Sequence, residues 1–182
     1  MARLPYADPA TPEAKPVAER IVAERGSLLQ LYRMLLHSVP LTEGWLAYLT
    51  AIRQRLSLSG ALRELVIMRV AILNGAQYEA DQHAPIALKE GVTQPQLDAL
   101  AQWESSDVFS QEQRTVLALT DTMTRDVQVP EGVLAAVREH LSDREVVELV
   151  ATIGAYNMVS RFIVALGIHS EDARRAGSSP SD

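Results

Sequence analysis

The stretch Leu62–Gly91, LRELVIMRVAILNGAQYEADQHAPIALKEG, decides the fold. Its first fifteen residues carry only three charges, Arg63, Glu64 and Arg69, among Leu, Val, Ile, Met and Ala. A surface helix of a globular protein has a polar face, whereas this one is apolar nearly all round. The stretch therefore predicts a helix in the middle of the domain.

The second half of the stretch, which follows Asn74 and Gly75, is rich in groups that exchange protons. Five side chains that exchange protons or form hydrogen bonds lie within six positions: Tyr78, Glu79, Asp81, Gln82 and His83. A purely structural helix does not need this density. If the protein has a chemical function, we expect it here.

Composition limits the class of protein. A chain of 182 residues, 47% hydrophobic and 22% charged, fits one globular domain with a well-developed core. The net charge of -6 argues against nucleic acid as a partner, because phosphate binding needs clustered positive charge. No apolar run approaches the length of about 18 residues that spans a membrane, and Pro and Asp occupy the N-terminus where a signal peptide would be apolar. We expect a cytoplasmic protein that does not enter a membrane.

The chain contains no cysteine. This absence excludes disulfides, thiolate nucleophiles, redox CxxC motifs and Cys-ligated metal sites.

The rest of the sequence predicts helices and no sheet, because no segment alternates with period two between turn signals. Helices are expected at residues 12–26, 28–36, 42–56, 62–76, 78–88, 97–103, 110–126, 133–141 and 142–166. Capping-box patterns open three of them, at Thr93, Ser110 and Ser142, and Pro85 is expected to kink its helix or start a new turn. We predict an all-α, single-domain helical bundle. Residues 1–11 form an extended Pro-rich arm that covers the domain or reaches a neighbouring subunit, 12–170 form the helical domain, and 171–182 form a flexible tail.

A similarity between two segments of the chain, called the echo below, suggests two similar helical units. Both LSGALRELVIMRVAILNGA and LSDREVVELVATIGAYN begin with Leu-Ser, followed by an Arg-Glu pair and a long apolar helix. Two buried helices share composition in any case, so the echo is a weak indication of a pseudo-twofold arrangement.

Glu79 and His83 are four residues apart and share one face of a helix, where they can hydrogen-bond. A carboxylate beside an imidazole can both take and give a proton near neutral pH. The alternative is a solvated surface pair, which contributes only a few tenths of a kcal/mol. The pattern alone favours the surface pair.

Glu64 lies in a helix whose other faces are predicted to be buried. An ionised carboxylate in that position needs a partner, or its pKa rises and it becomes a candidate acid or base. Arg63 or Arg69 could instead hold it in a structural ion pair, and the sequence leaves the two readings equal. Tyr78 adds a phenol beside the pair, although buried tyrosines more often serve packing. Glu79, Asp81 and His83 lack a second histidine at matched spacing, so no metal site is predicted.

The run RELVIMRVAILNGAQYEADQHAPIALKEGVT resembles the carboxymuconolactone decarboxylase family, which shares the all-helical fold of the alkyl hydroperoxide reductase D proteins. The run LSDREVVELVATIGAYNMVSRFIVALGI resembles the closing helix of that family, so the likeness covers roughly residues 28–168. In the redox-active branch, a Glu precedes the first Cys of a CxxC by twelve positions, and a His follows the second Cys by four. Glu64 and His83 match that Glu and His, whereas the two Cys positions fall on Ala76 and Glu79.

The resemblance implies that Glu64 and His83 line one pocket, and that thiol chemistry cannot operate. What remains is a proton relay of Glu64, Tyr78, Glu79 and His83. The resemblance also implies a cofactor-free acid–base enzyme, a decarboxylase that acts on a small carboxylated lactone. It further implies self-association into a homo-oligomer. Two alternatives stay open: a peroxidase-related oxidoreductase without Cys, which would need a metal or organic cofactor, and a non-catalytic oligomer that binds a small molecule.

Overall fold

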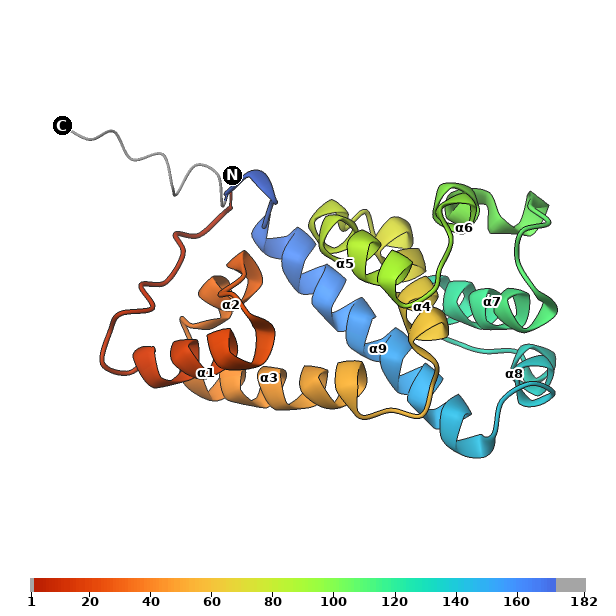
Figure 1. Cartoon of the computed structure of the whole chain (residues 1–182), viewed down its shortest axis with the longest axis horizontal. Coiled ribbons are helices and arrows are strands. Elements are labelled where there is room, and N and C mark those ends of the chain that lie inside the picture. The colour runs from red at the N-terminus through yellow and green to blue at the C-terminus, as the bar shows by residue number, and fades with distance from the viewer. Residues whose placement is uncertain (1, 173–182) are drawn as a thin grey trace. The chain divides into compact units, whose positions relative to one another are not determined.

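The computed structural model describes residues 2–172, and every regular element within them is a helix (Figure 1). The prediction of an all-α fold is therefore confirmed. The helices are α1 (Lys15–Arg25), α2 (Gln30–Leu35), α3 (Val39–Gln54), α4 (Gly60–Leu73), α5 (Gln77–Lys89), α6 (Gln94–Ala99), the 3-10 helix η1 (Leu100–Ser105), α7 (Gln111–Arg125), α8 (Glu131–Arg138) and α9 (Asp143–Leu166).

The described residues form two compact units, residues 2–51 together with 165–172, and residues 52–164. All four predicted site residues lie in the second unit. Helix α4 and most of α9, which carry the sequence echo, also lie there, so these units are not the two repeats that the echo suggests. The echo and the domain boundaries at residues 12 and 170 stay predictions. Of the predicted tail, residues 173–182 lie outside the described part of the chain.

Helix α4 is the core of the second unit, as the sequence predicts. It packs against α5 and α7, and its apolar side chains from Leu62 to Ala71 are buried on every face, whereas Ile72 near its end is exposed. One cluster joins α4 to α5, η1 and α7 through Leu65, Met68, Ala87, Leu100, Trp103 and Leu117. Burial of this much apolar surface is the main force that holds α4 inside the unit.

A buried ion pair ties α4 to η1 and α7. The Arg69 guanidinium donates to both carboxylate oxygens of Asp121, each at 2.6 Å, and to the carbonyl oxygens of Leu100 and Ala101. The Trp103 indole N–H also donates to Asp121. Arg69 therefore has a structural partner and is not available to Glu64.

Helix α9 is long and apolar enough, by length and composition, to cross a membrane, which the sequence analysis did not anticipate. It is the one such helix among residues 2–172, and half of its apolar window is buried. The core helix of a globular protein meets the same criteria. Asn157 and Ser160 lie within it, both buried and hydrogen-bonded, in a network that includes Thr124 of α7.

The predicted helix ends agree with the structure where a cap is present. Capping boxes form at Thr93 and Ser110, and Ser142 exchanges hydrogen bonds with Glu145 at the start of α9. At Pro85 α5 continues as a single helix, so of the two outcomes expected there the helix does not break, and the kink stays a prediction. Packing of α5 on α4 outweighs the one backbone hydrogen bond that proline removes.

The Pro-rich arm contacts its own unit. The Arg3 backbone N–H donates to the Leu166 carbonyl at 2.8 Å, and the Tyr6 hydroxyl donates to Asp172 at 2.7 Å. The Arg33 guanidinium also lies over the Tyr6 ring, 5.4 Å from its centre. These contacts favour the first of the two roles considered for the arm, that of covering its own chain.

Candidate functional site

The turn between α4 and α5 sets the position of the predicted site. Gly75 has a φ of 63°, which favours glycine, and Ala76 precedes the first residue of α5 with only 1% of its surface exposed. The Asn74 side-chain amide donates to Asn157 at 3.0 Å and to Ser160 at 2.7 Å. Because this network holds the turn against α9, α5 begins at a fixed place and its first turns face the interior.

Glu64 and His83 meet in that interior. The Nδ1 atom of His83 lies 2.7 Å from Oε2 of Glu64, and Glu64 is fully buried. The Arg63 Nε donates to the other carboxylate oxygen at 3.1 Å. Both oxygens of Glu64 are therefore engaged, and of the two arginines considered from the sequence, Arg63 is the partner. The structure brings together two residues that lie nineteen positions apart, on different helices.

The environment determines the protonation of the pair. Burial alone would raise the pKa of Glu64, but the hydrogen bond and charge of His83 and the charge of Arg63 outweigh burial and hold it below its usual value. Burial lowers the pKa of His83, and the bond and charge of Glu64 oppose this without cancelling it. At neutral pH an ionised Glu64 thus accepts from Nδ1–H of a neutral His83. This tautomer leaves Nε2 as a proton acceptor.

Glu79 behaves differently from Glu64. Only 2% of it is exposed, and neither carboxylate oxygen has a hydrogen-bond partner. The bond to His83 that the four-residue spacing allows is not formed, because His83 turns to Glu64 instead. Burial raises the pKa of Glu79 well above its usual value. Glu79 is therefore a protonated, neutral carboxyl group. It lies one helical turn before His83.

The protonation of Glu79 predicts a pH-dependent effect of Glu79→Gln on stability. The folded protein keeps a proton on Glu79 that the unfolded chain loses above a pH of about 4.3, so stability falls as pH rises towards the pKa of the folded state. The variant lacks this loss. We therefore expect the melting temperature of Glu79→Gln to exceed that of wild type by clearly more at pH 8 than at pH 4. Glu104→Gln is the control for removal of a surface carboxylate, and a pH-independent difference for Glu79→Gln would contradict a buried neutral acid.

Two tyrosines lie near these groups, and sequence reasoning identified only one. Tyr78 is buried on α5 beside Glu79. Tyr156 of α9 was missed, yet its ring packs edge-on against His83 with the ring centres 5.2 Å apart and the planes at 89°. It lies in a long apolar run, far in sequence from the other site residues. The available signal was a phenol within a mostly apolar stretch of helix, since a buried tyrosine hydroxyl normally needs a partner.

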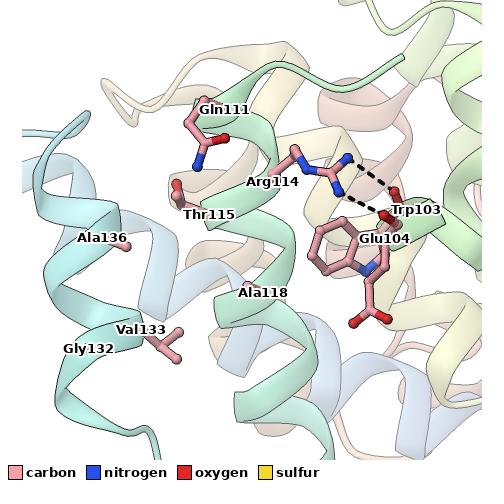
Figure 2. Close-up of a pocket in the computed structure, with 9 residues that line it drawn as sticks. All are labelled: Trp103, Glu104, Gln111, Arg114, Thr115, Ala118, Gly132, Val133 and Ala136. Atoms are coloured by element: carbon pink, nitrogen blue, oxygen red, sulfur yellow. Dashed lines mark hydrogen bonds between the residues drawn. The ribbon is translucent and has the colours of Figure 1, made fainter. Parts of the chain in front are cut away.

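A separate pocket of about 380 Å³ lies between η1, α7 and α8 and contains none of the predicted site residues (Figure 2). Its lining consists of Trp103, Glu104, Gln111, Arg114, Thr115, Ala118, Gly132, Val133 and Ala136. The Arg114 guanidinium donates to the backbone carbonyls of Glu104 at 2.7 Å and Ser106 at 2.6 Å, and it lies over the Trp103 ring. Arg114 therefore serves to hold η1 on α7.

Among residues 2–172, no group of three His, Asp or Glu side chains is placed to hold a metal ion. The absence of a metal and of a cofactor from the working protein stays a prediction.

Comparison with known proteins identifies the relatives of the chain. Residues 40–122 match the model of the carboxymuconolactone decarboxylase family. The uncharacterized protein YdfG of Bacillus subtilis is 32% identical over 113 residues, which cover 61% of this chain and 77% of that protein.

Solved structures resemble the whole chain. An uncharacterized peroxidase-related protein from Ralstonia eutropha, described as an alkylhydroperoxidase AhpD core, has a TM-score of 0.80 at 19% identity and covers 99% of this chain and 98% of its own. The debrominase Bmp8, solved with 2,3,4-tribromopyrrole, has a TM-score of 0.79 at 17% identity over 97% of both chains. At these identities the likeness establishes the alkylhydroperoxidase D-like fold.

Proposed function

Because the chain belongs to the carboxymuconolactone decarboxylase family, we propose that it is a cofactor-free acid–base enzyme that decarboxylates a small carboxylated lactone. The observation that carries the proposal is the buried contact between Glu64 and His83. Perturbed proton-exchanging groups that meet inside a protein are characteristic of catalytic sites, although structural pairs also occur.

The reaction needs proton transfer and no redox partner. The bond between the ring carbon and the carboxylate breaks, and its electron pair moves through the ring double bond into the lactone carbonyl to give an extended enolate while CO2 leaves. One proton then adds to carbon and restores the carbonyl. The lactone itself accepts the electron pair, and for this reason the step does not require a cofactor.

The residues divide this work according to their protonation. His83 transfers the proton through Nε2, and Glu64 orients the ring and fixes its tautomer. Glu79, a neutral acid on the same helix face, is a second proton source. Tyr78 stabilises the developing enolate by a hydrogen bond. Glu64 takes the orienting role because it binds the imidazole, whereas Glu79 does not.

The test is turnover of carboxymuconolactone by the purified protein. We expect one CO2 to be released for each molecule of carboxymuconolactone consumed. A coupled CO2 assay and product analysis of the same reaction measure the two amounts. Binding of the lactone without CO2 release would contradict the proposal and favour the alternative of a small-molecule-binding oligomer.

A peroxidase-related activity is the second candidate, since similar folds occur in proteins described as peroxidase-related. Without cysteine, it would require a bound metal or organic cofactor as the redox group. Consumption of hydroperoxide by the purified protein, with elemental analysis and an absorption spectrum of the same sample, distinguishes it from the decarboxylase.

We also propose that the protein is homo-oligomeric and cytoplasmic, without nucleic-acid or membrane partners.

A further inference from the structure

The interior around His83 holds two buried groups whose hydrogen-bonding capacity is unused. The hydroxyl of Tyr156 has no partner, and neither has either carboxylate oxygen of Glu79. Both residues are almost fully buried, at 1% and 2% exposure. A buried polar atom without a partner costs free energy, and such atoms are few in native proteins, so each calls for an explanation.

Both groups belong to one place in the fold. The ring of Tyr156 on α9 packs perpendicular to the His83 ring, and Glu79 precedes His83 by one turn on α5. Glu64 of α4 binds Nδ1 of the same imidazole. Two helices, α5 and α9, thus bring an imidazole, a neutral carboxyl group and a phenol to one interior, and of these only the imidazole has a hydrogen-bond partner, Glu64.

A positive charge lies close to this interior. Arg53 lies in the last turn of α3 and is half-buried. Its charge acts on both His83 and Tyr156, since it lowers the pKa of each. Burial nevertheless raises the pKa of Tyr156 above its usual range, so the hydroxyl remains a donor.

We propose that the Tyr156 hydroxyl binds the substrate, by donating a hydrogen bond to an oxygen of an anionic carboxylated lactone placed beside His83. The protonated Glu79 is a second donor and Arg53 supplies the countercharge, so the guest must be rich in acceptor oxygens and negatively charged. A carboxylate attached to a lactone meets both conditions, whereas an uncharged lactone meets only the first. The inference rests on the proposed function and adds a binding residue to it.

The test combines stability and binding in Tyr156→Phe. Because the hydroxyl has no partner in the free protein, its removal should leave the melting temperature unchanged or raise it. Binding of γ-carboxy-γ-butyrolactone, a stable probe measured by calorimetry, should weaken about 10- to 100-fold, the effect of losing a hydrogen bond to a charged group. γ-Butyrolactone, which lacks the carboxylate, should bind the wild-type protein more weakly than the carboxylated probe. Tyr32→Phe, a buried tyrosine of α2 in the other unit, is the matched control and should leave probe binding unchanged.

Three results would overturn the inference: equal binding of the carboxylated probe by wild type and Tyr156→Phe, a clear drop in the melting temperature of Tyr156→Phe, or no binding of the probe by wild type. A drop in melting temperature would mean that the hydroxyl has a structural partner. Failure of the proposed function looks different, because the probe would still bind and depend on Tyr156 while carboxymuconolactone released no CO2.

Discussion

His83→Ala lowers kcat for carboxymuconolactone by about 10²- to 10⁴-fold, the usual contribution of a positioned acid–base group. The imidazole is the one group of the site that can accept a proton near neutral pH, through the Nε2 atom that Glu64 leaves free. The far-UV circular dichroism should stay helical, because Glu64 keeps its bond to Arg63. The measurement is kcat by CO2 release beside the spectrum of the same sample.

Two further variants separate the role of His83 from a general effect. Glu64→Gln keeps the side-chain shape but removes the charge that fixes the imidazole, so we expect a smaller loss of kcat than for His83→Ala. His140→Ala removes an exposed histidine far along the chain from the site and is the matched control. Activity that survives His83→Ala would exclude the proposed mechanism.

Asp121→Ala destabilises the fold by about 3–5 kcal/mol, because it leaves the buried Arg69 guanidinium without its carboxylate. The same change removes the acceptor of the Trp103 indole N–H. Urea unfolding followed by circular dichroism measures the free energy of unfolding. The loss should appear as a lower midpoint with little change in slope.

The controls for this prediction use the same network. Arg125 also reaches Asp121, at 3.2 Å, but its side chain is 55% exposed, so Arg125→Ala should cost less than about 1 kcal/mol. The double variant Arg69→Met/Asp121→Leu removes both buried charges and should recover much of the loss. Equal stability of Asp121→Ala and Arg125→Ala would show that the buried pair does not hold α4, η1 and α7 together.

The fold was predictable from the sequence because its signals are local. Helix periodicity and capping residues depend on neighbours a few positions apart, and the boxes at Thr93 and Ser110 formed as expected. The outcome at Pro85 was not predictable, since the continuous helix depends on packing between α5 and α4. The partner of Arg69 was equally hidden, because Asp121 lies 52 positions away.

The sequence predicted which residues belong to the candidate site better than it predicted which of them contact each other. Spacing alone suggested that Glu79 binds His83, and only the resemblance to a family suggested that Glu64 lines the same pocket as His83. The geometry of the α4–α5 turn decides between them and leaves Glu79 as an isolated acid. Tyr156 escaped notice because its contact with His83 joins helices 73 positions apart in sequence.

The buried start of α5 bears on how one scaffold could change its chemistry. Ala76 and Glu79, the positions that match the two thiols of the redox branch, are adjacent in space, with the Glu79 N–H donating to the Ala76 carbonyl at 3.0 Å. The imidazole and its carboxylate anchor stay in place beside them. Descent from a sulfur-dependent ancestor, or the reverse, would therefore need only a few substitutions on an unchanged framework.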